Sequence, residues 1–308
     1  MEGRYASICA LSGHDPSRLI VSSVVITGAG GFLGRRLVPR LAGTVEVVAV
    51  ARESVPGLSR VTPIAADLGP GWTVALPSHA DGVVWLAQSR RYREFPDGAH
   101  DMFRVNEAAL FDLLDWARRS GVQRLVYAST GSVYAASSAP LAETAPTLPS
   151  SFYAASKLNG EHLVSQYAGE FEVVIARIFG LYGSGQTGMA MAAIVEAVAQ
   201  CRPVELTDGV GMTLTPLHVD DAAAIMEQLL RVELPEPLLV VNVAGVERVT
   251  LADVARETGR LLGIAPVIRS RSGEAPALIA DVAKLRALLP GMMFKPLRAG
   301  LAETLRVS

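Results

Sequence analysis

The chain has 308 residues, of which 50% are hydrophobic and 19% are charged, and its formal net charge is −2. This length is sufficient to bury a sizeable core, as one large domain or one and a half. A near-neutral chain without a sustained basic run argues against nucleic acid or an anionic membrane as partner. Two cysteines and five scattered histidines without ligand spacing indicate neither a disulfide framework nor a metal site.

Residues 1–18 are expected to form a poorly ordered extension. Polar residues and a proline at 12–16 interrupt the apolar residues there, so the segment lacks the long apolar stretch of a signal peptide. No later stretch reaches the roughly 20 apolar residues that a membrane-spanning helix needs. We therefore expect a cytoplasmic protein without a membrane partner, ordered from about residue 19.

The ordered chain begins with an apolar run that ends at Thr27 and is followed by a glycine-rich segment. Gly28, Gly31 and Gly34 stand three residues apart, between a predicted buried strand and a predicted helix at residues 35–41. The first two glycines permit a tight turn and close approach of the backbone to a pyrophosphate. The third lets the helix pack on the strand, and the helix N-terminus faces the negative charge. This arrangement predicts a dinucleotide site.

A second predicted strand, from residue 45, bears on the cofactor subtype. About 20 residues after the glycine turn, an acidic residue normally binds the adenosine ribose of NAD. Ala51 takes that position here, followed by Arg52 and Glu53. Arg52 could hold the 2′-phosphate of NADP, whereas Glu53 could take the ribose hydroxyls of NAD. The expected cofactor is NAD or NADP, with a slight lean to NADP from Ala51-Arg52.

Predicted strands alternate with helical stretches, which is typical of a doubly wound parallel sheet. Further strands are expected at residues 61–66, 81–87, 123–128, 171–179 and 238–243, and helices at 103–120, 189–200 and 251–262. We predict an α/β, Rossmann-type doubly wound sheet with a smaller C-terminal substrate-binding lobe. The Rossmann domain would comprise residues 19–178 and about 214–243, and the lobe about 179–213 and 244–308.

Tyr153 and Lys157 stand four residues apart on a predicted helix that follows a candidate N-cap serine in residues 149–151. An ammonium about 4 Å from a phenol, at an effective dielectric near 20, is worth roughly 4 kcal/mol, or about three pK units. Lys157 would thereby make Tyr153 a usable proton acceptor. Thr130, at the carboxyl end of a predicted strand, could bind a substrate oxygen. The alternatives are a surface tyrosine and a turn that caps a strand.

Taken together, these residues resemble the extended short-chain dehydrogenase/reductase family, in its NAD-dependent epimerase/dehydratase branch. The resemblance spans about residues 20–300 and rests on Thr27-Gly28-x-x-Gly31-x-x-Gly34, Asp67-Leu68, Asn106, Thr130, Val133-Tyr134, Tyr153 with Lys157, and Arg177-x-Phe179-x-x-Tyr182-Gly183. It implies that Tyr153 exchanges a proton with a substrate hydroxyl as hydride passes between that carbon and the nicotinamide. Lys157 would lower the tyrosine pKa and hold the nicotinamide ribose, and Thr130 would orient the reacting oxygen.

The expected binding residues follow from the motifs and the resemblance together. The cofactor contacts would be Gly28, Gly31, Phe32, Leu33, Gly34, Arg52, Asp67, Leu68, Leu86, Ala87, Asn106, Tyr153, Lys157 and Ile178. The candidate substrate contacts are Gln88, Gly131, Ser132, Gln186, Thr187 and His218. For His218 a structural role beside an apolar strand is the alternative. The resemblance also implies a homodimer, through helices around residues 103–120 and 152–168.

The chain departs from the family pattern in three places that bear on the substrate. Gly131-Ser132 follow Thr130 where dehydratases carry Asp-Glu, which argues against a 4,6-dehydratase. Gly180, not asparagine, follows Phe179, and no arginine precedes Asp220 at residues 212–218. Both losses weaken a standard UDP-sugar site. The missing charge could come instead from Arg90, Arg91, Arg93, Arg269 or Arg271.

The leading hypothesis is an NAD(P)-dependent nucleotide-sugar epimerase, or a related ketoreductase, that acts by reversible hydride transfer. An epimerase keeps its cofactor and returns the hydride to the other face, whereas a reductase releases it. One alternative is a reductase or dehydrogenase of a smaller carbonyl compound or alcohol, which the missing arginine favours. The other is a non-catalytic cofactor-binding protein, because fold alone does not establish catalysis.

Overall fold

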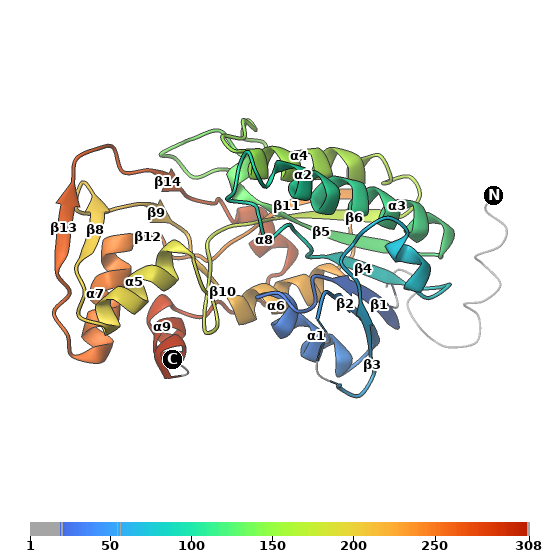
Figure 1. Cartoon of the computed structure of the whole chain (residues 1–308), viewed down its shortest axis with the longest axis horizontal. Coiled ribbons are helices and arrows are strands. Elements are labelled where there is room, and N and C mark those ends of the chain that lie inside the picture. The colour runs from blue at the N-terminus through green and yellow to red at the C-terminus, as the bar shows by residue number, and fades with distance from the viewer. Residues whose placement is uncertain (1–18, 20, 54, 56, 307–308) are drawn as a thin grey trace.

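The centre of the molecule is a parallel β-sheet with helices on both faces (Figure 1). The computed structural model describes residues 19, 21–53, 55 and 57–306, so the expected extension at residues 1–18 lies outside the described residues. Within them the sheet has seven strands in the order β11-β6-β5-β4-β1-β2-β3. These strands are β1 (Ser23–Thr27), β2 (Glu46–Ala51), β3 (Val61–Ala65), β4 (Gly82–Trp85), β5 (Arg124–Thr130), β6 (Glu172–Ile178) and β11 (Leu238–Val243). The predicted Rossmann-type fold is confirmed, and the strand order reverses between β1 and β4.

Buried side chains from alternate strand positions hold the helices on the two faces. Val24 and Ile26 of β1 pack with Leu37 on the face that α1 (Gly34–Ala42) and α6 (Val219–Leu229) cover. Val25, between them, packs with Leu110 on the opposite face, beneath α3 (Ala109–Arg119) and α4 (Phe152–Ser165). A strand turns successive side chains to opposite faces, so a sheet with apolar residues at both positions is covered on both sides.

The helix expected at residues 103–120 is interrupted. It consists of α2 (Ala99–Phe103), a π-helical turn at Arg104–Ala108, and α3. Such a turn inserts an extra residue into the helical ladder and often lies near a functional site. Here the turn carries the buried Asn106, whose Oδ1 accepts a hydrogen bond from the Ser89 amide (2.9 Å) and whose Nδ2 donates to Ser156 Oγ (2.9 Å).

Besides α6 and β11, three elements after β6 lie against the sheet: β7 (Leu181–Tyr182), β10 (Leu217–His218) and α8 (Ala283–Leu288) contribute Leu181, Leu217 and Leu285 to the apolar cluster beneath α1 and α6. The others gather beyond one end of the sheet, on the left in Figure 1. They are α5 (Ala190–Ala199), β8 (Val204–Thr207), β9 (Thr213–Leu214), β12 (Val249–Thr250), α7 (Leu251–Leu262), β13 (Ile268–Arg271), β14 (Ala277–Leu278) and α9 (Leu297–Arg306). An apolar cluster of their own, with Ile194, Val254 and Leu301 at its centre, joins α5, α7 and α9. The division into a Rossmann domain and a lobe stays a prediction. None of the helices in the described part of the chain has the length and apolar character needed to cross a bilayer.

Candidate active site

The glycine-rich turn after β1 has the backbone that its sequence predicts. Gly28 has a φ of +67°, and a Cβ there would lie 2.8 Å from the backbone nitrogen of Ala87. A Cβ on Gly34 would lie 2.6 Å from the carbonyl oxygen of Ala29. A side chain at either position would collide with the backbone, which explains why glycine stands there. Helix α1 begins at Gly34, so its first turn points toward the carboxyl ends of the strands.

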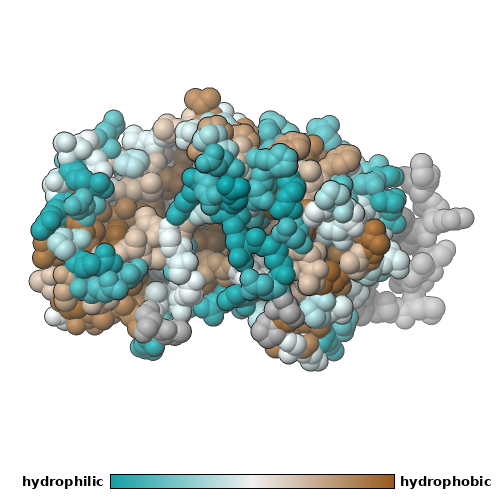
Figure 2. Space-filling model, in the orientation of Figure 1, coloured by the Kyte–Doolittle hydropathy of each residue, from teal (hydrophilic) through white to brown (hydrophobic). Residues whose placement is uncertain are grey.

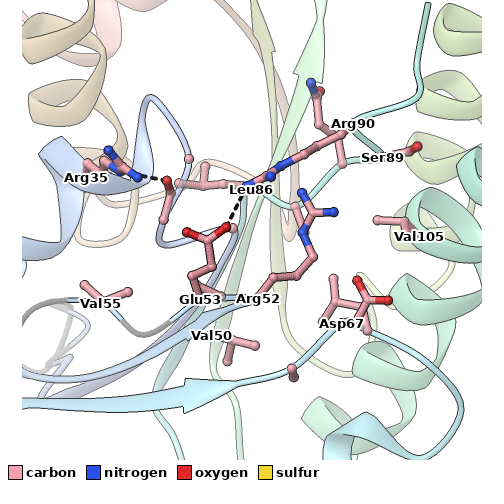
Figure 3. Close-up of a pocket in the computed structure, with 18 of the residues that line it drawn as sticks. Arg35, Val50, Arg52, Glu53, Val55, Asp67, Leu86, Ser89, Arg90 and Val105 are labelled. Carbon is pink, nitrogen blue, oxygen red and sulfur yellow. Dashed lines mark hydrogen bonds and ion pairs between the residues drawn. The ribbon is translucent and has the colours of Figure 1, made fainter. Parts of the chain in front are cut away.

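A cavity of about 930 Å³ opens beside this turn (Figure 3). Its wall is formed where four strands end, by Gly28 after β1, Ala51 of β2, Ala66 after β3 and Leu86 after β4. Seven of the expected cofactor residues line it: Gly28, Gly31, Arg52, Asp67, Leu68, Leu86 and Ala87. The volume is typical of a cofactor site, and the carboxyl ends of the strands are where such ligands bind. The glycine backbone, guanidinium groups and apolar walls of this cavity fit a dinucleotide.

Several lining residues of the cavity were not foreseen, and Arg35 is the most informative. It lies in the first turn of α1, and its Nε donates a hydrogen bond to the carbonyl oxygen of Gly30 at 2.9 Å. Arg35 and Arg52 have no carboxylate partner among the described residues, whereas Glu53 pairs with Arg90 at 4.0 Å (Figure 3). A basic residue directly after the third glycine was the signal in the sequence that could have identified Arg35.

Besides Tyr153 and Lys157, which are described below, five expected cofactor residues lie outside the lining of this cavity. Phe32, Leu33 and Gly34 lead into α1, and Ile178 is the last residue of β6. Asn106 is buried behind the loop after β4, where it connects Ser89 to α4 through the hydrogen bonds given above. The roles of these five residues in cofactor binding stay predictions.

The expected catalytic tyrosine lies at the start of α4. Ser151 Oγ accepts a hydrogen bond from the Ala154 amide at 3.2 Å, which confirms the predicted serine N-cap. The Tyr153 hydroxyl donates to Gln88 Oε1 at 3.3 Å, and Gln88 lines the cavity described above. The tyrosine also shares a hydrogen bond with the side chain of Thr130, at the end of β5. Thus the structure brings Tyr153 together with Thr130 and with one expected substrate residue at the rim of the cavity.

The charge states of the tyrosine and the lysine differ from the sequence-based expectation. Burial raises the pKa of Tyr153 to about 12, although the hydrogen bond with Thr130 acts to lower it. Burial also lowers the pKa of Lys157 to about 7, although the negative charge of Glu161 opposes this. The expected fall in the tyrosine pKa is therefore wrong for this structure. Desolvation penalises the charged form of each group, and a lysine that readily loses its proton stabilises a phenolate poorly.

Below Tyr153 and Lys157, a buried ion pair connects α4 to β6. Arg177 Nη2 lies 2.7 Å from Glu161 Oε2, and Ser129 Oγ also donates to Glu161. The Arg177 guanidinium lies over the ring of Tyr134, with Cζ 4.7 Å from the ring centroid. Two residues of the family pattern, Arg177 and Tyr134, thus support the helix that carries the expected catalytic pair.

Lys157 itself is 3% exposed and packs on the aromatic ring of Tyr127. Its Nζ lies 4.5 Å from that ring's centroid, and the Tyr127 hydroxyl donates to the carbonyl oxygen of Lys157 at 3.2 Å. The Tyr127 ring thus faces the Lys157 side-chain nitrogen, and the Tyr127 hydroxyl holds the Lys157 backbone. The position of Lys157 is therefore determined by β5 beneath it as well as by its own helix.

The remaining substrate candidates are dispersed. Gly131 packs against the ring of Phe179, since a Cβ there would lie 2.7 Å from a ring carbon, and the Ser132 amide donates to Thr130 Oγ1 at 3.2 Å. Gln186 and Thr187 line a different cavity, of about 410 Å³, between the loop after β7, α5 and α9. Gln186 Nε2 donates to the carbonyl oxygen of Leu181 at 2.7 Å. Their contact with a substrate stays a prediction.

His218 has a structural position at the start of α6. Its Nδ1 accepts a hydrogen bond from the Asp220 amide at 3.3 Å, and its ring meets the ring of Tyr182 edge-on with centroids 5.2 Å apart. Burial lowers the pKa of His218, as does the positive charge of Lys295. It does not line the cavity near Tyr153. These contacts favour the structural alternative.

Comparison with known proteins connects this site to a family. A model of the NAD-dependent epimerase/dehydratase family matches residues 24–244. The chain is 31% identical over 183 residues to a UDP-glucose 4-epimerase of Azospirillum brasilense, covering 54% of this chain and 52% of the relative, or about half its length. It is 27% identical over 315 residues to dTDP-4-dehydro-6-deoxy-D-allose reductase of Streptomyces bikiniensis, covering 92% of this chain and 95% of the relative.

Solved structures show the same fold over nearly the whole chain. MoeE5 in complex with UDP-glucuronic acid and NAD is 28% identical and has a TM-score of 0.80, covering 92% of this chain and 98% of that one. UDP-glucuronic acid 4-epimerase from Bacillus cereus, in complex with NAD, is 22% identical with a TM-score of 0.83, covering 92% of this chain and 96% of that one. The chain belongs to the NAD-dependent epimerase/dehydratase family.

Proposed function

We propose that this protein is an NAD(P)-dependent nucleotide-sugar epimerase, or a related ketoreductase, in which Tyr153 is the acid and base. The observation that carries the proposal is the hydrogen bond of the Tyr153 hydroxyl to Gln88 at the rim of the dinucleotide-sized cavity. Lys157 follows one helical turn later and is buried. A proton-exchanging phenol next to a nicotinamide site is the arrangement that hydride transfer at a secondary alcohol requires.

The residues divide the proton chemistry between them. The lining of the cavity, with Gly28 and Gly31 at the turn, would hold a nicotinamide cofactor, which would supply or accept the hydride when bound. With a pKa of about 12, Tyr153 is protonated at neutral pH and can donate its proton to a carbonyl oxygen. Thr130 Oγ1 accepts from the Ser132 amide, so its hydroxyl hydrogen is the donor in the contact with Tyr153 and can turn to the same carbonyl oxygen when a substrate is bound. In the direction of alcohol oxidation Tyr153 must lose its proton, and a protonated Lys157 favours that phenolate.

For the cofactor we propose a preference for NADP over NAD. Arg35 and Arg52 line the cavity without a carboxylate partner among the described residues, and Ala51 replaces the acidic residue that would bind the ribose hydroxyls. A guanidinium binds phosphate oxygens in a bidentate manner.

A second candidate is a reductase or dehydrogenase of a smaller carbonyl compound or alcohol. It is favoured by the segment before Asp220, which has no arginine, and by Gly180, which replaces the asparagine of the family pattern. L-arabinose 1-dehydrogenase (NAD(P)(+)) of Haloferax volcanii is a relative, 27% identical over 263 residues. The intact Thr130, Tyr153 and Lys157 argue against a non-catalytic protein.

The test is to titrate the purified protein with NAD⁺ and NADP⁺, and then to incubate the loaded protein with UDP-glucose, UDP-glucuronic acid or L-arabinose. Conversion of a nucleotide sugar without net change in nicotinamide absorbance would support an epimerase. Stoichiometric change of that absorbance would support a reductase or dehydrogenase, with the substrate that turns over deciding between the two candidates. Cofactor binding without turnover of any compound would contradict both.

We also propose a homodimer, in keeping with the family. Phe103 on α2 and Phe111 on α3 are 54% and 53% exposed, and Leu148, before α4, is 70% exposed. Phe103 and Phe111 lie on helices expected at the interface, and Leu148 precedes the other one. Large apolar residues that gather on one helix layer of a protein surface often mark a contact with a second subunit. The cytoplasmic location stays an expectation.

A further inference from the structure

The loop after β4 reaches toward the catalytic tyrosine. Its residues 90–93 read Arg-Arg-Tyr-Arg. The ring of Tyr92 lies beside the ring of Tyr153, with centroids 5.3 Å apart and planes at 53°, and Tyr92 also lines the cofactor cavity. Figure 2 shows hydrophilic side chains over the middle of this face, above a hollow, where Figure 1 places this loop. The loop therefore forms one wall of the approach to Tyr153.

Arg93 extends from this loop to the segment after β7. Its Nη1 donates a hydrogen bond to the carbonyl oxygen of Gly188, and its Nη2 lies 3.0 Å from Met189 Sδ. Its Cζ lies 5.1 Å from the centroid of the Tyr92 ring. The Tyr92 centroid lies 5.3 Å from the Tyr153 centroid and 5.1 Å from Arg93 Cζ. The separation of Arg93 Cζ from the Tyr153 ring centroid therefore cannot exceed these two distances taken together. A single sugar ring with its substituents can span that separation.

The charge of Arg93 is not neutralised by any carboxylate of the described residues. Its neighbours differ, because Arg91 Nε lies 2.7 Å from Glu94 and Arg90 pairs with Glu53 at 4.0 Å. A carbonyl oxygen, a thioether and an aromatic ring are the partners of the Arg93 guanidinium. A guanidinium with neutral partners at the entrance to a site is suited to bind a carboxylate or phosphate.

The segment before Asp220 lacks a positively charged side chain. In the family pattern an arginine often precedes the segment at residues 218–220, but here that place is taken by buried, uncharged residues. Leu214 and Thr215 are 6% and 4% exposed, and Thr215 Oγ1 accepts a hydrogen bond from the Ala280 amide at 3.0 Å. A substrate anion therefore finds no guanidinium at this position. Arg93, in the loop after β4, is a guanidinium without a carboxylate partner among the described residues.

We propose that Arg93 is a specificity-determining residue that binds an anionic group of the substrate, a carboxylate or a phosphate, beside the carbon that reacts at Tyr153. Tyr92 positions the Arg93 guanidinium, because the Tyr92 ring contacts both the ring of Tyr153 and that guanidinium. The inference rests on the proposed function, and it narrows the substrate to an acidic one. A sugar carboxylate is one source of the anion, and the diphosphate of a nucleotide sugar is the other.

The test is calorimetric titration of the full chain, saturated with its preferred nicotinamide cofactor, with UDP-glucose, UDP-glucuronic acid and uridine. Arg93→Gln is compared with the wild type and with Arg91→Gln, a matched control whose native arginine has its own partner in Glu94. We expect Arg93→Gln to lower the affinity for UDP-glucuronic acid at least about ten-fold and to leave the affinity for uridine unchanged. Arg91→Gln should bind all three compounds as the wild type does.

The ligands also identify the source of the anion. If Arg93→Gln loses affinity for UDP-glucuronic acid alone, the sugar carboxylate is the group that Arg93 binds. If it loses affinity for UDP-glucose equally, the diphosphate is that group. Unchanged binding of both nucleotide sugars by Arg93→Gln overturns the inference while the proposed function stands. An equal loss of affinity for uridine, together with a lower unfolding temperature, would show that Arg93 only stabilises the segment after β7. That result also overturns the inference. A wild-type protein that binds neither nucleotide sugar contradicts the proposed function, and the inference falls with it.

Discussion

The hydroxyl of Tyr153 and the side-chain oxygen of Gln88 lie 3.3 Å apart, which joins the start of α4 to the loop after β4. A substrate carbonyl that replaces Gln88 as acceptor would receive the tyrosine proton from the same direction. Residues far apart in the chain therefore meet at the Tyr153 hydroxyl, the proposed acid and base, and Gln88 connects it to the cavity proposed for the cofactor.

Tyr153→Phe should lower kcat by about 10² to 10⁴-fold, because it removes the group that exchanges the proton. The affinity for the cofactor should change little, since the ring remains. Steady-state rates with a turned-over substrate, and cofactor titration, measure the two effects. Tyr167→Phe, at the far end of the helix where Tyr167 stacks on Phe171, is the control. Equal rates for Tyr153→Phe and the wild type would contradict the mechanism.

The buried Lys157 should make stability depend on pH. Its folded pKa is about 7, whereas the ordinary value is 10.5, so between these limits the unfolded chain binds more protons than the folded one. The free energy of unfolding contributed by this group therefore rises with pH across that range, on the order of 1.4 kcal/mol for each pK unit. Lys157→Met should be more stable than the wild type near pH 7, with a difference that shrinks toward pH 10. Urea unfolding at several pH values tests this, and a constant difference would contradict it.

Arg35 and Arg52 should determine the choice of dinucleotide. Arg35→Gln and Arg52→Gln should each lower the affinity for NADP⁺ about ten-fold and change the affinity for NAD⁺ little, because the 2′-phosphate is the proposed partner of each guanidinium and NAD⁺ lacks it. Glu53→Gln, which removes the nearby carboxylate, should leave NADP⁺ at least as tightly bound. Fluorescence titration with both dinucleotides measures these affinities. Equal losses of affinity for NAD⁺ and NADP⁺ would mean that the arginines do not discriminate by the 2′-phosphate.

Removing one partner of the Glu161–Arg177 ion pair should lower the free energy of unfolding substantially. Both side chains are buried, so Arg177→Met leaves the Glu161 carboxylate without its partner and should cost about 3–5 kcal/mol of unfolding free energy. The double variant Glu161→Met with Arg177→Met should recover part of that loss, since no uncompensated charge remains. Chemical denaturation of the three proteins tests this. Identical stabilities of the single and double variants would refute it.

The exposed phenylalanines of α2 and α3 should hold the proposed dimer together. Phe103→Glu combined with Phe111→Glu should convert the dimer to a monomer, because each carboxylate would be buried in an apolar contact. Val74→Glu is the control, since Val74 is 89% exposed and lies in a separate turn at Trp72–Ala75. Sedimentation velocity measures the state, and a monomeric wild type would refute the proposal.

The sequence by itself determined the features that depend on local spacing. The glycines at 28, 31 and 34 predict a turn that only glycine can adopt, and the structure confirms it with a φ of +67° at Gly28. The alternation of apolar strands with helices predicts the parallel sheet. The four-residue spacing of Tyr153 and Lys157, after the Ser151 cap, predicts the helix that carries them. Each of these signals is complete within a few residues of the chain.

Only the tertiary structure decided how these residues behave. The pKa of Tyr153 rises and that of Lys157 falls because segments from elsewhere in the chain, such as the strand with Tyr127, exclude water from them. The same is true of His218, which caps a helix, and of Tyr92, whose ring lies beside Tyr153. Burial and long-range contacts are properties of the packed molecule, and the linear pattern does not contain them. The sequence therefore predicts which groups are catalytic, and packing sets their charge and their neighbours.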